Sequence, residues 1–211
     1  TALSQVAVAS AFVGQDSAAP ELGVRLAATP AADRGVDTNI NLAFAYAKMG
    51  DTARARRYLA DANLASVPDA QLRELLTQVF DGLLAVGTGR HSEAIKRLEN
   101  LPLENRHTLV MNALFTRAHA YAATGRPAEA ERDFRDVLAR RPQLQYNLAT
   151  PYAHVGLARA LAAQGNTIGA REEYKKFLDL WSQADADIPV LQEVKAEVAR
   201  LQSLAEGSAT P

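Results

Sequence analysis

The chain has 211 residues, a formal net charge of −1 at pH 7, no cysteine, 48% hydrophobic residues and 6% aromatic residues. A nearly neutral chain without a sustained basic stretch lacks the electrostatic footprint of a nucleic-acid-binding protein. The absence of cysteine excludes disulfides and thiolate chemistry, and no apolar run approaches the 18 residues that indicate a membrane span.

The first 35 residues predict a degenerate N-terminal helical hairpin. Leu3 to Val13 and Pro20 to Ala28 form two short helical stretches, with Gly14 as the turn between them. Whether this segment is a true copy of the repeat described next is left open. Because the chain begins with Thr1 and Thr1–Ser4 is not a signal peptide, we expect a piece of a longer protein or a processed product.

From residue 36 a short pattern recurs four times. A small residue is followed by a Tyr, Ala or Leu three positions later, a Gly after four more and an Ala after a further five. The copies are Ala43-x2-Tyr46-x3-Gly50-x4-Ala55, Gly82-x2-Ala85-x3-Gly89-x4-Ala94, Ala118-x2-Tyr121-x3-Gly125-x4-Ala130 and Ala158-x2-Leu161-x3-Gly165-x4-Ala170. The glycines are 39, 36 and 40 residues apart. A recurring period of this size indicates a stacked-repeat protein.

Each copy predicts two antiparallel helices that meet at its glycine. In the first copy, residues 39–48 have helical periodicity, Gly50 supplies the left-handed position that ends a helix, and Asp51 offers an oxygen to cap the next one. We assign the four repeats, within residues 36–187, to about 36–69, 75–108, 111–142 and 151–184. Their second helices are expected at about 53–64, 92–100, 127–140 and 167–181.

A last helix is expected over residues 188–205, followed by a disordered tail over 206–211. Val190, Leu191, Val194, Val198 and Leu201 form its apolar stripe, which would cover the exposed end of the fourth repeat. The single tryptophan, Trp181, is expected to pack under this capping helix; an exposed anchor for a partner is the alternative.

The repeated residues are similar to the tetratricopeptide repeat (TPR). The third copy fits best, with Ala118, Tyr121, Gly125, Ala130, Phe134, Leu138 and Pro142 in the family's order. The second copy departs by having Ala85 in place of the Tyr, and the spacings exceed the family's 34 residues. The resemblance implies an all-α fold, a TPR-like right-handed α-solenoid of about five helical hairpins plus a C-terminal capping helix, that works as a protein-protein interaction module.

A narrower resemblance covers Tyr152 to Gln202, including the run Glu172-Glu173-Tyr174-Lys175-Lys176-Phe177. It is similar to the C-terminal end of TPR regions in acidobacterial-type Ser/Thr protein kinases. The implied role is the recruitment or sensing region of a bacterial Ser/Thr kinase or signalling regulator. We expect this chain to be non-catalytic, because it has no Gly-rich nucleotide loop, catalytic His-Arg-Asp segment or Asp-Phe-Gly. Gly87-Thr88-Gly89 predicts a helix–helix turn.

The family resemblance places the inner face of the first helices along a concave groove. The residues expected there, as a peptide-binding site, are Ile40, Phe44, Leu76, Val79, Leu83, Phe115, His119, Tyr152, Val155 and Arg159. Apolar pockets of this kind would hold an extended or helical peptide. The alternative is that several of these side chains pack between neighbouring helices. The groove lacks the recurring Lys, Asn and Arg with which TPR proteins clamp a C-terminal carboxylate.

The expected partner is a protein or peptide ligand in that groove, or the chain's own upstream domain, with no nucleic acid and no membrane insertion. A self-associating scaffold, whose groove is filled by another copy, is the alternative function. We expect no cofactor and no metal, because the four histidines have no partners among themselves at helical spacing. A metal site would require His119 and His154 to meet across adjacent repeats. The compartment, cytoplasmic or extracytoplasmic, is left open.

Overall fold

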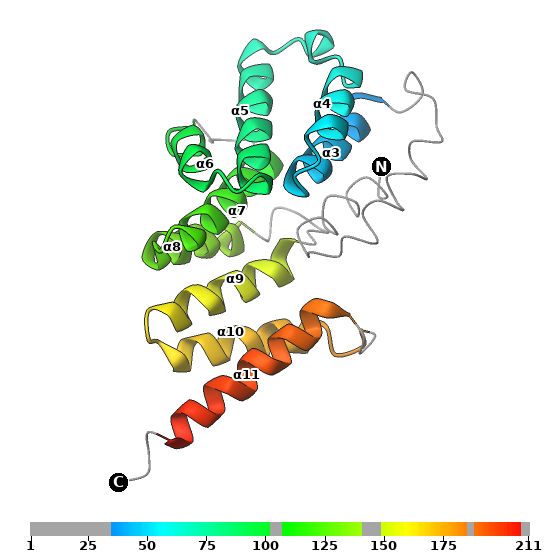
Figure 1. The fold of residues 1–211 in the computed structure, drawn as a ribbon. Helices are drawn as coiled ribbons and strands as arrows, with labels where there is room; N and C mark the ends of the chain where they lie inside the picture. The colour runs from blue at the N-terminus through cyan, green and yellow to red at the C-terminus, as the bar shows by residue number, and fades with distance from the viewer. Residues whose placement is uncertain (1–34, 102–106, 141–148, 185–187, 208–211) are drawn as a thin grey trace.

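The computed structural model describes residues 35–101, 107–140, 149–184 and 188–207 (Figure 1). The expected N-terminal hairpin lies outside these residues except for Gly35. All the secondary-structure elements within the described residues are helices, and none is a strand. The helices are α3 (Gly35–Lys48), α4 (Thr52–Asp61), the 3-10 helix η2 (Leu64–Ser66), α5 (Ala70–Gly87), α6 (His91–Leu98), α7 (His107–Ala123), α8 (Pro127–Ala139), α9 (Ala149–Ala163), α10 (Thr167–Leu180) and α11 (Pro189–Gly207).

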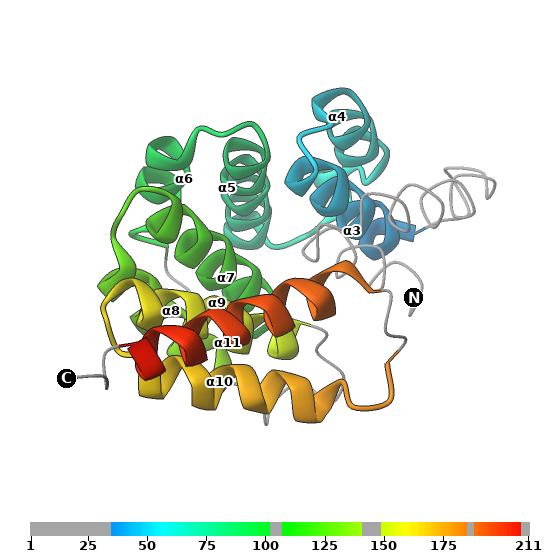
Figure 2. The ribbon, with the colours of Figure 1, turned by 60° about the horizontal axis from the view of Figure 1, so that its bottom comes forward.

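These helices form four described hairpins, α3/α4, α5/α6, α7/α8 and α9/α10, followed by α11 at the end of the stack (Figures 1 and 2). The prediction of an all-α solenoid is therefore confirmed. α11 continues to Gly207, so residues 206 and 207, expected in a disordered tail, are helical, and the rest of that expected tail lies outside the described residues.

The turn inside each hairpin explains the spacing of the repeated residues. Gly50, Gly89, Gly125 and Gly165 all have φ between 72° and 78°, the left-handed region that favours glycine. In each copy the amide that follows the glycine donates to the carbonyl of the Tyr, Ala or Leu of the pattern, as Asp51 N does to Tyr46 O at 3.0 Å. The glycine amide donates to the next carbonyl along, so that each first helix ends in a Schellman motif.

The start of each second helix follows from the residues after the glycine. Asp51 caps α4 by accepting from the amide of Arg54, and Asn166 caps α10 by accepting from the amide of Gly169, both at 3.0 Å. Pro127 occupies the first turn of α8, where its missing N–H leaves no hydrogen bond unmade.

The small residues of the pattern let the two helices of a hairpin approach each other. All the alanines of the pattern that follow the glycines are fully buried, at Ala55, Ala94, Ala130 and Ala170. A Cβ atom on Gly82 would lie only 2.8 Å from the side chain of Leu98. The tyrosines of the pattern are core residues: Tyr46 stacks on Tyr58, and Tyr121 is buried.

The stack is tighter on the side of the first helices. α3 packs against α5, α5 against α7 and α7 against α9, whereas the described second helices make at most marginal contacts with one another. The first helices therefore share one side of the stack, which we call the inner side, and the second helices share the other, which we call the outer side. Between the first two repeats the contact is made by α3 and α5, because α4 makes no more than marginal contact with α5.

A buried ion pair lies within the third repeat, and its arginine also bonds to the second repeat. Asp133 of α8 is fully buried and accepts from Arg117 Nε at 2.6 Å and Nη2 at 2.9 Å. Arg117 of α7 also donates to the carbonyl of Leu98 at 2.9 Å, at the C-terminal end of α6. One side chain therefore holds three helices together with charge-assisted hydrogen bonds.

The last helix, α11, packs on the fourth repeat through apolar side chains. Val190, Leu191 and Val194 are buried in the core formed by the third and fourth repeats. Trp181 is half-buried and contacts Tyr152 and Phe177, with ring centroids 5.7 and 5.2 Å away. It therefore packs into the core rather than standing out as an exposed anchor.

Candidate protein-binding surface

The eight apolar residues expected in the groove lie in the core. Each is no more than 8% exposed: Ile40, Phe44, Leu76, Val79, Leu83, Phe115, Tyr152 and Val155. The first five pack in one core cluster, formed mainly by the first two repeats, and the other three in the cluster of the later repeats. These side chains therefore form no open apolar groove. They pack between helices, which is the alternative given for them above.

The physical reason is the packing of each first helix against the helices around it. Large apolar side chains of a first helix are covered by the second helix of the same hairpin and by the neighbouring repeat before any partner arrives. Phe115 of α7, for example, meets the ring of Phe134 on α8 edge-on at 5.7 Å, and Tyr152 of α9 lies against Phe177 on α10 at 6.4 Å. Close approach is possible because Gly156 of α9 has no Cβ, whose place is taken by the Phe134 ring.

His119 lies between two aromatic rings. Its imidazole is 4.6 Å from Phe115 and 5.3 Å from Phe134, measured between ring centroids. Its Nε2 is buried and has no hydrogen-bond partner among the described residues. Burial, together with the positive charges of Lys48 and Arg159, holds the pKa of His119 well below 6.5, so the ring is neutral at pH 7.

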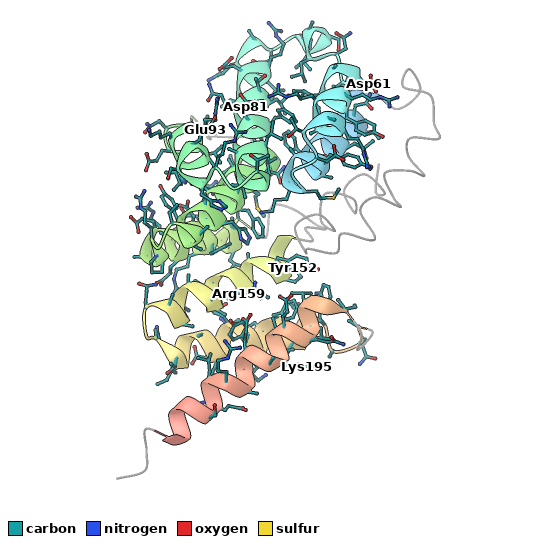
Figure 3. The ribbon with its side chains drawn as sticks, viewed as in Figure 1. Asp61, Asp81, Glu93, Tyr152, Arg159 and Lys195 are labelled. Carbon is teal, nitrogen blue, oxygen red and sulfur yellow. The ribbon has the colours of Figure 1, made fainter. Side chains whose placement is uncertain are left out.

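Arg159 is the one exposed member of the predicted set, and α11 already contacts it. Figure 3 labels Arg159 on α9. Its guanidinium donates to Glu197 at 2.8 Å and to Glu193 at 3.0 Å, both from α11. The Tyr174 hydroxyl also donates to Glu197. Burial raises the pKa of Glu197, but hydrogen bonds from Arg159 and Tyr174 outweigh burial and hold that pKa below its usual value. The carboxylate is therefore charged at pH 7, and α11 is fixed to α9 and α10.

Lys48, at the end of α3, was not predicted as a site residue. It is half-buried, and burial lowers its pKa to about 8. Its positive charge contributes to lowering the pKa of His119 of α7. The sequence feature that could have indicated Lys48 is its position four residues after Phe44, because residues at this spacing lie on one face of a helix.

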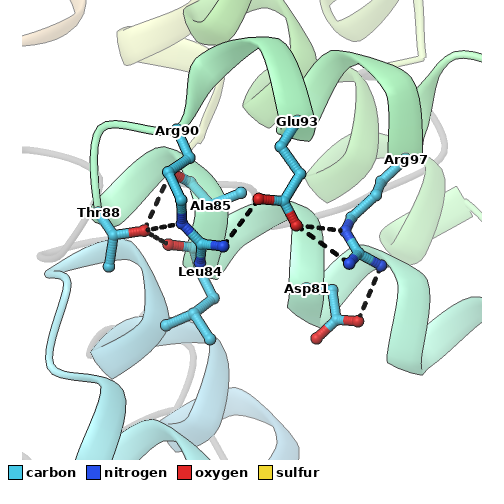
Figure 4. A network of polar contacts seen from close by, with 7 residues as sticks. All are labelled: Asp81, Leu84, Ala85, Thr88, Arg90, Glu93 and Arg97. Carbon is cyan, nitrogen blue, oxygen red and sulfur yellow. Dashed lines mark hydrogen bonds and ion pairs between the residues drawn. The ribbon is translucent and has the colours of Figure 1, made fainter.

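On the outer side, many charged residues are engaged with each other. Figure 4 shows such a network across α5 and α6, in which Arg97 contacts Asp81 at 3.1 Å and Glu93 at 3.0 Å. Arg90 contacts the same Glu93 at 2.7 Å. Hydrogen bonding from Arg97 is the main cause that lowers the pKa of Glu93. Exposed pairs of this kind add little to the stability of the repeat.

A hollow that was not predicted from the sequence lies between α10 and α11, and we name it the α10–α11 groove. It encloses about 420 Å³. Its lining includes Ile168, Arg171, Glu172, Lys175 and Leu178 of α10 and Val198 of α11. Ile168, at 73% exposed, is the most exposed large hydrophobic residue in the described part of the chain.

His154, considered above as a partner for His119, is paired differently. Its Nδ1 lies 2.6 Å from a carboxylate oxygen of Glu173 on α10, and both residues are buried. Lys176 Nζ donates to the other oxygen at 2.7 Å. Within the part of the chain that the structure describes, no three His, Asp or Glu side chains gather as a metal site requires.

The Glu173 cluster makes stability depend on pH. Burial raises the pKa of Glu173, but hydrogen bonds from His154 and Lys176 outweigh burial, and the net pKa is below the ordinary 4.5. A lowered native pKa contributes stability above the unfolded value and loses it as pH falls through the native value. We expect Glu173→Gln to lower the free energy of unfolding by about 2 kcal/mol at neutral pH.

Urea unfolding at about pH 7 and about pH 3 checks this. The difference between wild type and Glu173→Gln should shrink on acidification, because the native carboxylate takes up its proton. The exposed Asp136 of α8 provides the control, since Asp136→Asn should change little at either pH. A Glu173→Gln difference that stays constant or grows on acidification contradicts the assignment.

None of the described helices is both long and apolar enough to cross a membrane. Two tetratricopeptide repeat family models match segments of the chain, one over residues 39–61 and one over residues 115–185. The eroded second copy of the pattern lies between them. None of the curated proteins matches the chain. A solved structure described as MamA AMB-1 C2221 is similar, with 24% sequence identity over 85% of this chain and 96% of that chain, and a TM-score of 0.46.

Proposed function

We propose that this chain, a tetratricopeptide repeat protein, is a protein-protein interaction module that binds its partner along the first-helix side of the stack. The observation that carries the proposal is the continuous contact from α3 through α5 and α7 to α9. It gives one inner side, built by four consecutive first helices. A side of this length suits an extended or helical segment of a partner protein.

The residues that we propose for contact differ from the original ten. The eight apolar members are covered, which leaves His119, Arg159 and the additional Lys48 as the polar groups of the inner side. Lys48 and Arg159 are cationic, and the positive charge of each lowers the pKa of His119. A partner segment with acidic side chains would complement them.

The finer proposal is that the module serves as the recruitment or sensing region of a bacterial Ser/Thr kinase or signalling regulator. It rests on the resemblance of Tyr152 to Gln202 alone. The upstream domain would then supply any catalysis, and that domain itself is a further possible partner.

The binding proposal is tested by isolating a partner with the immobilised chain and titrating the identified partner in solution. Lys48→Ala and Arg159→Ala, on first helices, should each weaken binding by about tenfold, equivalent to about 1.4 kcal/mol. Arg57→Ala and Arg132→Ala, exposed on second helices, should change affinity by less than about twofold. Circular dichroism verifies that all four variants are folded.

Weaker binding of the second-helix variants alone would place the partner on the outer side. If the chain captures only itself, the alternative of a self-associating scaffold replaces the proposal. Charged replacements of Phe44 or Leu83 do not test binding, because both side chains are in the core and the expected result is unfolding.

A further inference from the structure

The α10–α11 groove has the form of a helix-binding surface. Ile168, Arg171, Glu172 and Lys175 recur at three- and four-residue spacing, so they lie along one face of α10. From Ile168 to Leu178 this face is about 15 Å long, since an α-helix rises about 1.5 Å per residue. Val198 of α11 forms the opposite wall. The dimensions suit one amphipathic helix laid along α10.

The charged residues of this groove differ in their pairing. Lys175 is paired with Asp179 at 2.7 Å. Arg171 and Glu172, in contrast, have no ion-pair partner among the described residues. Two adjacent side chains of opposite charge, both exposed, therefore stand beside the strongly exposed Ile168. An occupant of the groove should offer one acidic and one basic group, together with an apolar side chain.

We propose that the occupant is a second copy of this chain, with the two α10 helices antiparallel about a twofold axis between residues 171 and 172. In this register Arg171 of each copy faces Glu172 of the other, so both unpaired charges are matched twice. Ile168 of each copy lies beside Lys175 and Leu178 of the other. The aliphatic stem of Lys175 can cover Ile168 while its ammonium stays with Asp179.

Self-complementarity favours a second copy over an unrelated helix. A twofold interface uses the same patch on both subunits, so the patch must carry each group together with that group's partner. Arg171 with Glu172, and Ile168 with the apolar wall, meet this requirement within one helix face. This interface is on the second-helix side, and it goes beyond the partner binding proposed above. Its test is independent of any partner.

Sedimentation equilibrium of residues 1–211 over a range of concentrations tests the proposal. Wild type should show a reversible monomer–dimer equilibrium that weakens with added salt. Ile168→Asp should raise the dissociation constant at least about tenfold, because it places a charge in the apolar contact. Leu180→Asp is the matched control, since Leu180 is on the same helix, 47% exposed and outside the groove, and this variant should dimerise as wild type does.

Charge reversal tests the register. Arg171→Glu alone and Glu172→Arg alone each bring like charges together twice, and each should weaken the dimer at least about tenfold. The double variant Arg171→Glu/Glu172→Arg restores both pairs and should dimerise as wild type does. A monomer at every concentration overturns the proposal. So does a dimer that is indifferent to Ile168→Asp, or one in which the double variant is as weak as the single variants.

Discussion

Replacing Asp133 with Ala is expected to lower the free energy of unfolding by about 3–5 kcal/mol. The carboxylate is fully buried and holds Arg117 through two hydrogen bonds of 2.6 and 2.9 Å. Without it, a guanidinium that is only 12% exposed loses its counter-charge. Hydrogen bonds to the carbonyls of Leu98 and Glu99 remain, but neither supplies a negative charge. Equilibrium unfolding in urea measures the loss.

Two further variants distinguish the effect of the uncompensated charge from the effect of removing side-chain atoms. Asp136→Ala, an exposed position on the same helix, should cost less than about 0.5 kcal/mol. The double variant Arg117→Met/Asp133→Leu removes both charges and should recover most of the loss, because no unpaired charge remains buried. A double variant as unstable as Asp133→Ala would show that packing, and not the uncompensated charge, causes the loss.

Replacing Gly87 with Ala is expected to cost about 3 kcal/mol, at the upper end for overpacking by one methyl group. The added Cβ would meet the carbonyl oxygen of Ala47, and it would lie 2.7 Å from the Gly50 amide nitrogen and from the Lys48 carbonyl oxygen. All three are backbone atoms, which cannot rotate away as a side chain can. Because α3 and α5 carry the contact between the first two repeats, we expect the first repeat to separate at lower urea concentration.

Gly89 is the matched control, two residues further along. It has φ 76°, but a Cβ there would meet nothing within 4 Å. Gly89→Ala therefore carries only the strain of the left-handed conformation, about 1–2 kcal/mol. Thermal and urea unfolding of both variants distinguish the two causes. If Gly87→Ala costs no more than Gly89→Ala, the close backbone contact between repeats does not limit that position.

Much of the hairpin architecture could be predicted from local sequence. The four glycines of the pattern occupy the left-handed positions predicted for them, and Asp51 caps its helix as expected. These features depend on residues within about five positions, so a single sequence carries them fully. The second helices expected at 92–100, 127–140 and 167–181 run from His91 to Leu98, Pro127 to Ala139 and Thr167 to Leu180.

The candidate site was less predictable because exposure depends on the neighbouring helix. Phe44 and Leu83 occupy the same position in the pattern, and sequence alone permits a groove or a contact between helices. How closely two first helices pack decides between them. Arg159 illustrates the same point, since its partners Glu193 and Glu197 are 34 and 38 residues away in the chain. No local spacing indicates that α11 would bring them there.

The sequence by itself determined where each hairpin turns and which small residues face inward, since left-handed backbone, capping and helical periodicity are short-range properties. Only the tertiary structure decided which apolar side chains are covered, which charges are paired and which surface is left to a partner. Those outcomes depend on contacts between helices that are distant in sequence. They turn the predicted apolar groove into core, and leave Lys48, Arg159 and the α10–α11 groove as the surfaces to be tested.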